Sequence, residues 1–137
     1  MGSRVFLDTN IVLDFIILNR KNSHLAKRVL SRIMKLDYEI FISEDIISTT
    51  YYIAKNHKKE TIKFFIEALN FWHIIPFGKN VLRNSFEFSL KYNTDLEDTL
   101  QCFCAKENGC FLLTNDKKFI DCGVEIVTYE KFLDNYD

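Results

Sequence analysis

Aspartates occur at three points of the sequence, each next to a short apolar run of the kind that forms buried strands or next to the segment that leads into one. Asp8 directly follows one short apolar run, Asp116 comes shortly after another, and Asp95 and Asp98 open the segment that leads into the second run. Carboxylates from distant segments repel one another at close range unless a cation lies between them. Oxygen ligands without a neighbouring Cys or His suit Mg²⁺ or Mn²⁺, which also bind phosphate groups. The pattern therefore predicts a divalent metal site that acts on a phosphodiester.

Each of these aspartates also has a purely structural interpretation. Asp8, Asp95 and Asp116 are suitable N-caps for helices, because a short carboxylate accepts hydrogen bonds from free backbone N–H groups. Asp98 would lie in a first helical turn, where the helix dipole favours an anion. Each interpretation is reasonable for one residue alone. Helix caps have no reason to converge on one point, however, so the group as a whole favours the metal site.

Short apolar runs alternate with segments of helical periodicity along the chain. The runs predict strands at Arg4 to Leu7, Glu39 to Ile42, His73 to Phe77, Phe111 to Thr114 and Val124 to Val127. Helices are predicted after Asp8, over Asn22 to about Leu36, from Ser43 towards Lys55, around Ile62 to Leu69, over Val81 to about Lys91, from Asp95 to a left-handed Gly109, and over Tyr129 to Tyr136. This alternation predicts an α/β fold with three α/β/α layers around a central parallel sheet of about five strands. In such sheets ligands bind beyond the carboxyl ends of the strands, which is where Asp8 and Asp116 are expected.

Length and composition limit the class of protein. The 137 residues fit a single domain spanning 1–137, and 47% hydrophobic residues are enough for a core. A net charge of −1 provides no global basic field for nucleic acid. We expect a cytoplasmic protein, because the sequence contains no signal peptide and no apolar run long enough to cross a membrane. The cysteines at 102, 104, 110 and 122 form no CxxC pair, so we expect buried thiols and neither a zinc site nor a disulfide.

Basic residues gather in two segments, while the histidines show no ligand or triad spacing. The two segments contain Lys27, Arg28, Arg32 and Lys35 in the first and Lys55, His57, Lys58, Lys59 and Lys63 in the second. Solvated helix faces are the favoured interpretation of both. Contact with an RNA backbone or with an acidic partner segment is the alternative. We assign no role to His24, His57 or His73.

Three short motifs occur in a fixed order along the chain. They are Phe6, Leu7, Asp8, Thr9 and Asn10; then Asp95, Leu96, Glu97, Asp98, Thr99 and Leu100; and finally Leu113, Thr114, Asn115 and Asp116 with Phe119 after them. In this order and spacing the sequence resembles the PIN domain family, in particular the VapC-like ribonuclease toxins of bacterial toxin-antitoxin modules. The resemblance covers nearly the whole chain.

The resemblance implies a site and an activity. Its catalytic, metal-binding carboxylates would be Asp8, Asp98 and Asp116, with Asp95 as an auxiliary ligand of Mg²⁺ or Mn²⁺. The side chains that would hold these acids by hydrogen bonds are Thr9, Asn10, Thr114 and Thr49. It further implies a metal-dependent endoribonuclease in which a metal-activated water attacks the phosphodiester and Asp116 or Asp98 accepts the proton. The expected products then carry 5′-phosphate and 3′-hydroxyl ends.

The sequence departs from the family pattern at one position. Family members commonly have a Glu on the helix after the second strand, and Thr49 occupies its place here. Asp45 lies one helical turn earlier on the same face and could replace this acid, or the Thr49 hydroxyl could hold a metal-bound water. We expect a single metal and slower or more Mn²⁺-dependent cleavage. The alternative function is a catalytically weakened PIN-fold module that binds but does not cut.

Partners follow from the same resemblance. It implies an RNA substrate, an antitoxin protein and a homodimer, and excess aromatic side chains could form the interfaces. The side chains in question are Tyr51, Tyr52, Phe64, Phe65 and Phe71. A receiver domain or haloacid-type phosphatase also places Asp after its first strand. Such a phosphatase needs a second Asp where this chain has Asn10, so we disfavour that class.

Overall fold

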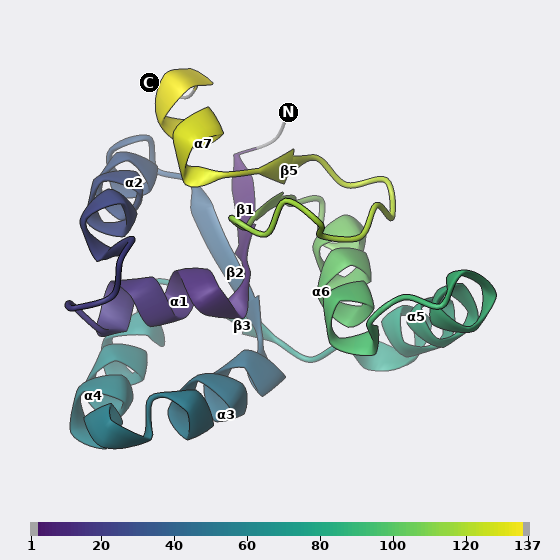
Figure 1. Cartoon of the computed structure of the whole chain (residues 1–137), viewed down its shortest axis with the longest axis horizontal. Coiled ribbons are helices and arrows are strands. Elements are labelled where there is room, and N and C mark those ends of the chain that lie inside the picture. Colours follow the sequence, from purple (N-terminus) through teal and green to yellow (C-terminus); the bar gives the residue numbers. More distant parts are fainter. Residues whose placement is uncertain (1–2, 136–137) are drawn as a thin grey trace.

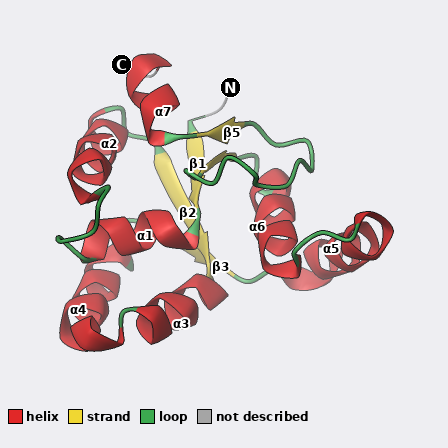
Figure 2. Ribbon diagram, in the orientation of Figure 1, coloured by secondary structure: helices red, strands yellow, loops and turns green. Residues whose placement is uncertain are grey.

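A central sheet of five parallel strands organises the computed structural model, which describes residues 3–135. The strands are β1 (Arg4–Leu7), β2 (Glu39–Ser43), β3 (His73–Ile75), β4 (Phe111–Leu113) and β5 (Ile126–Val127). Their order across the sheet is β3-β2-β1-β4-β5, and every neighbouring pair is parallel. Figure 2 shows these strands at the centre with helices on both sides. The predicted three-layer parallel architecture is therefore confirmed.

Seven α-helices in the described residues cover the sheet. They are α1 (Thr9–Ile16), α2 (Ser23–Lys35), α3 (Glu44–Ile53), α4 (Lys58–Ala68), α5 (Gly78–Tyr92), α6 (Leu96–Glu107) and α7 (Tyr129–Asn135), and a short 3₁₀ helix covers Lys55–His57. In Figure 1 helices α1 to α4 lie on one side of the strands, and α6 lies on the other with α5 outside it. None of the helices in residues 3–135 is both long enough and apolar enough to span a membrane.

The central strand explains where polar side chains can gather. Val5, Phe6 and Leu7 are fully buried because helices cover both faces of β1. Leu7 pairs with Leu113 of β4, and Phe6 pairs with Phe41 of β2. Continuing this register by one or two residues places Asp8, Thr114 and Ser43 side by side at the carboxyl edge. The first polar residue after each central strand therefore meets the others.

The element ends differ slightly from the sequence prediction. Strand β3 ends at Ile75 instead of Phe77, because Pro76 has no backbone N–H to continue the ladder. Strand β4 ends at Leu113 instead of Thr114, and β5 begins at Ile126 instead of Val124. Gly109 has the expected left-handed conformation, with φ of +69°. The predicted end of the last helix, Tyr136, lies outside the described residues.

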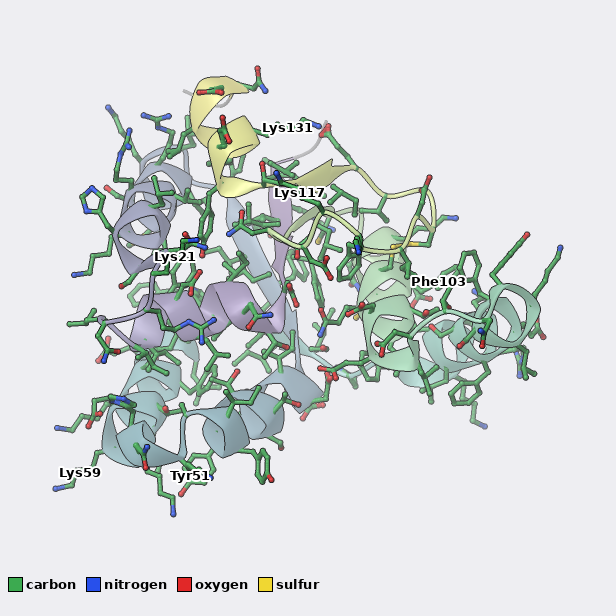
Figure 3. The ribbon with its side chains drawn as sticks, in the orientation of Figure 1. Lys21, Tyr51, Lys59, Phe103, Lys117 and Lys131 are labelled. Carbon is green, nitrogen blue, oxygen red and sulfur yellow. A yellow bond between two sulfur atoms is a disulfide. The ribbon has the colours of Figure 1, made fainter. Side chains whose placement is uncertain are left out.

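The expectation of four free thiols was wrong. Cys102 of α6 and Cys122 form a disulfide, with 6.2 Å between their Cα atoms, while Cys104 and Cys110 are buried free thiols as predicted. The disulfide is visible as the yellow bond between α6 and the loop that precedes β5 (Figure 3). Lys106 Nζ donates a hydrogen bond to the Cys122 carbonyl at 3.2 Å. This loop folds back along α6, a contact that the spacing of cysteines in the sequence does not reveal.

Candidate active site

Asp8 occupies the centre of the carboxyl edge. It stands at the N-cap position of α1, but its side chain makes no capping hydrogen bond within the described residues. The carboxylate instead accepts a 2.7 Å hydrogen bond at Oδ2 from the Thr114 hydroxyl, and the Asp8 backbone N–H donates to the Leu113 carbonyl at 3.1 Å. Only 7% of Asp8 is exposed. The Thr114 bond uses one of the two carboxylate oxygens, so the other can accept or ligate a further group.

Thr114 connects two of the predicted acids. This fully buried residue follows β4, and its hydroxyl oxygen accepts a 3.1 Å hydrogen bond from the Asp116 backbone N–H while donating to Asp8. The Asp116 side chain accepts a hydrogen bond at Oδ1 from the Lys118 backbone N–H at 2.9 Å, which stabilises the turn after β4. One hydroxyl thus fixes the position of Asp8 relative to the segment that carries Asp116.

Asp95 and Asp98 have different structural roles at the start of α6. Asp95 is the N-cap, because its Oδ1 accepts a 2.9 Å hydrogen bond from the Asp98 backbone N–H. The structural interpretation of Asp95 therefore holds for one of its oxygens. Thr99 adds a second bond at this helix start, donating through its hydroxyl to the Asp95 carbonyl at 2.6 Å. This cap fixes the orientation of the first turn, in which Asp98 lies half-buried.

The acids from these separate segments act on one another electrostatically. Burial, followed in order of importance by the charges of Asp95, Asp8, Asp116 and Glu97, raises the pKa of Asp98 to about 6. Burial is also the main cause that raises the pKa of Asp8. The Thr114 hydroxyl and then the Thr9 backbone N–H lower that pKa, and the charge of Asp116 raises it. The structure therefore brings Asp8, Asp98 and Asp116 into one region, as the sequence pattern predicted.

The remaining predicted side chains lie around this group. Thr9 is buried, and its hydroxyl oxygen accepts a hydrogen bond from Gln101 Nε2 at 3.3 Å. Asn10 is exposed, and its side-chain oxygen accepts from Arg20 Nη2 at 3.3 Å, so this contact is with a cation and not with an acid. Thr49 is half-buried on α3, one turn after Asp45. Roles for these residues in supporting the acids stay predictions.

Sequence reasoning missed two members of the site. Burial raises the pKa of Glu97, and the charges of Asp45, Asp95 and Asp8 raise it further in that order. Glu97 precedes Asp98 directly, and this density of acids in the first turn of α6 was the available signal. Gln101 is only 1% exposed, although it is a long polar side chain. A Gln one helical turn after Asp98, on the same face of the predicted helix, was the second signal, since a long polar side chain there needs a partner once it is buried.

The donor set fits a hard divalent cation in its chemistry. All candidate ligands are oxygen atoms, and several negative charges lie together where burial has raised their pKa values. No group of three or more His, Cys, Asp or Glu side chains in residues 3–135 is arranged to hold an ion as it stands. Mg²⁺ usually binds through one or two carboxylates and keeps several waters. A site of that kind needs only Asp8 and one neighbour as direct protein ligands.

The raised pKa of Asp98 predicts a pH-dependent stability of the metal-free protein. The folded state penalises the charged form of Asp98, so this penalty is complete above about pH 6 and disappears as pH falls towards 3.8. In chelator, Asp98→Asn should therefore be more stable than the unaltered protein at pH 7.5, and the gap should shrink by pH 5. Urea unfolding at both pH values measures the gap. An identical gap at the two values would show that Asp98 carries no such penalty.

Comparison with known proteins gives a consistent result. The PIN domain family model matches residues 5–124 of this chain. A curated relative named Ribonuclease VapC1, from Aquifex aeolicus (strain VF5), is 33% identical over 140 residues, which cover 99% of this chain and 97% of the relative. The match therefore extends beyond the three motifs to nearly the full length of both proteins.

Solved structures share the fold. VapC20 of Mycobacterium tuberculosis, described as a sarcin-ricin loop cleaving toxin, superposes with a TM-score of 0.74 at 11% identity, covering 88% of this chain and 95% of that one. VapBC2 from Rickettsia felis, bound to a DNA fragment from its promoter, gives a TM-score of 0.73 at 19% identity, covering 91% and 98%. At these identities the likeness concerns the fold alone.

Proposed function

The chain belongs to the PIN domain family, and from this premise we propose that it is a metal-dependent endoribonuclease, the toxin of a toxin-antitoxin pair. The observation that carries the proposal is the meeting of Asp8, Asp98 and Asp116 from three separate segments at the carboxyl edge of the sheet. The full-length similarity to a protein named as a ribonuclease supports RNA as the substrate. It also supports an enzyme over the non-cutting module, and family membership excludes a receiver or haloacid-type phosphatase.

The mechanism assigns a task to each side chain of the site. Asp8, Asp98 and Asp116, with Asp95 as auxiliary, would hold Mg²⁺ or Mn²⁺, and the Thr114 hydroxyl keeps Asp8 oriented through its 2.7 Å hydrogen bond. A divalent cation supplies a water of lowered pKa and offsets the charge that develops on the phosphate. Asp98 or Asp116 accepts the proton of the attacking water. Because water attacks, the 2′-hydroxyl of the RNA takes no part in the bond cleavage.

The chemistry of the cut ends tests this mechanism. Purified protein incubated with total RNA and Mn²⁺ should leave 5′-phosphate and 3′-hydroxyl ends, which ligation-based end mapping detects. Asp98→Asn keeps the shape of the side chain and removes its charge, so the same ends should disappear in a parallel reaction. Ends that carry a 2′,3′-cyclic phosphate would rule the mechanism out, because they require attack by the 2′-hydroxyl.

Partner binding is a second part of the proposal. A toxin-antitoxin complex from Klebsiella pneumoniae shares the fold, as does VapBC2 of Rickettsia felis, which supports an antitoxin as the partner of this chain. The cytoplasm is the proposed place of this contact. Exposed apolar side chains on α3 and at the end of α4 are candidates for that contact or for a homodimer. Tyr52 is 79% exposed and Phe71 is 73% exposed, and Tyr51 points outward from α3 (Figure 3). Phe65 is buried in the core, so its side chain is not available for an interface.

A further inference from the structure

Three polar side chains near the carboxyl edge have a buried oxygen without a hydrogen-bond partner among residues 3–135. These atoms are Ser43 Oγ, Asp45 Oδ1 and Gln101 Oε1. Ser43 is fully buried and Gln101 is 1% exposed, so bulk water does not reach these two side chains freely. A buried polar atom without a partner is costly, and a carboxylate oxygen is the most costly of the three. Such an atom needs a hydrogen-bond or ligand partner, which a bound water or ion supplies.

All three side chains belong to the surroundings of Asp8. Ser43 ends β2, and the β1–β2 register places it beside Asp8. Gln101 donates through Nε2 to the hydroxyl oxygen of Thr9, the residue after Asp8, so its amide group lies at the same edge. Asp45 lies in the first turn of α3, directly after β2. The unpartnered oxygens therefore come from the β2 side and from α6, on either side of Asp8.

The charge around Asp45 shows what kind of group is missing. Among the charged residues that act on Glu97, Asp45 has the strongest effect, ahead of Asp95 and Asp8. Asp45 lies in the first turn of α3 and Glu97 in the first turn of α6, and their like charges repel each other. A water molecule could donate to Asp45 Oδ1, but it would leave the repulsion among these acids unchanged. A cation would both provide a partner for the Asp45 oxygen and offset the repulsion between the acids.

We propose that Asp45 is a further acidic ligand of the divalent cation and approaches it from the β2 side of Asp8. The unpartnered Ser43 hydroxyl and Gln101 amide oxygen belong to residues that border Asp8 through the β1–β2 register and through Thr9. This inference rests on the proposed metal-dependent function and adds to it a specific ligand. It also accounts for a site in which Thr49, one turn further along α3, contributes no charge.

Binding of Mn²⁺ to the full chain tests the proposal directly. Calorimetry should show binding to the unaltered protein, and Asp45→Asn should weaken it about tenfold or more. Glu44→Gln is the matched control, because Glu44 is the exposed acid next to Asp45 on the same helix. This control should change the Mn²⁺ affinity less than about twofold, since exposed charges are screened by salt.

Thermal unfolding gives a readout that does not depend on catalysis. In chelator, Asp45→Asn should melt no lower than the unaltered protein, because the substitution removes the negative charge of a half-buried side chain whose Oδ1 has no partner. Saturating Mn²⁺ should raise the melting temperature of the unaltered protein and of Glu44→Gln, and should raise that of Asp45→Asn much less. If Asp45→Asn does not fold, Asp45→Ser provides the same comparison with a smaller side chain.

The outcomes separate this proposal from the proposed function. Unaltered protein that binds no Mn²⁺ would overturn both. Normal Mn²⁺ binding by Asp45→Asn would overturn the ligand role of Asp45 and leave the metal-dependent function standing, with a water or a proton as the missing partner. Equal weakening in Asp45→Asn and Glu44→Gln would also overturn it, because the effect would then come from net charge alone.

Discussion

Asp8→Asn is expected to lower the rate of RNA cleavage by at least about 100-fold, because the stabilisation that a bound metal provides is worth several kcal/mol. Asp8 accepts a hydrogen bond from Thr114, in the segment that carries Asp116, and its charge raises the pKa of Asp98. Asparagine preserves the shape and can still accept the Thr114 hydrogen bond. The variant should therefore fold, and its melting temperature in chelator should be unchanged or higher, since a buried charge is removed.

A matched control for this substitution exists on the surface. Asp37 is exposed and has φ of +58°, a left-handed conformation that asparagine also adopts readily. Asp37→Asn changes the net charge by the same amount and should cleave at the rate of the unaltered protein. Single-turnover cleavage of a fluorescent RNA at saturating Mn²⁺ measures both variants. Near-normal cleavage by Asp8→Asn would place the active centre elsewhere in the protein.

The sequence predicts the central acids because their placement depends on strand ends alone. Parallel strands bring their carboxyl ends to one edge, so a polar residue directly after a buried apolar run must lie there. This rule was sufficient for Asp8, Thr114 and Asp116. The same rule predicted the layers and the parallel order, because apolar runs that alternate with helices permit few other arrangements. The ends of the short strands and of some helices, such as α4 and α5, differed by a few residues.

Sequence patterns could not predict the contacts that helices make with one another and with loops. Asp45 approaches Glu97 because α3 and α6 start at the same edge of the sheet, and their relative position depends on packing that periodicity does not describe. Cys122 reaches Cys102 for a similar reason, since the loop after β4 returns along α6. The family resemblance suggested a missing acid at Thr49. The structure adds the unpartnered Asp45 oxygen, which makes one of the two proposed replacements testable.

Asp14 provides the clearest case of a residue that only the structure reveals. It lies in the apolar helix α1 with 4% of its surface exposed. Its Oδ1 accepts from Arg20 Nε at 2.7 Å, and its Oδ2 accepts from the Tyr129 hydroxyl at 2.8 Å. Arg20 also donates to Asn10, and the Tyr129 backbone N–H donates to Asn115 at 2.9 Å. Through Arg20 and Tyr129, Asp14 is therefore linked to Asn10, two residues after Asp8, and to Asn115, directly before Asp116.

Asp14→Ala is expected to lower the free energy of unfolding by about 3 kcal/mol, because removing one partner of a buried ion pair leaves the other groups uncompensated. The Tyr129 hydroxyl would lose its acceptor while fully buried, and the partly exposed Arg20 would recover some solvation. Such a loss is a large share of the roughly 5–15 kcal/mol that stabilises a typical domain. Urea unfolding should show a lower midpoint with an unchanged slope.

Two further variants identify the source of this loss. Tyr129→Phe removes the hydroxyl together with its need for a partner and keeps the Asp14–Arg20 pair, so it should cost about 1 kcal/mol. Asp134→Ala removes an exposed acid from α7 and should stay within about 0.5 kcal/mol of the unaltered protein. If Asp14→Ala were as stable as Asp134→Ala, the buried network would contribute nothing to folding. The residues beside Asp8 and Asp116 would then depend for their positions on the sheet edge and on Thr114 alone.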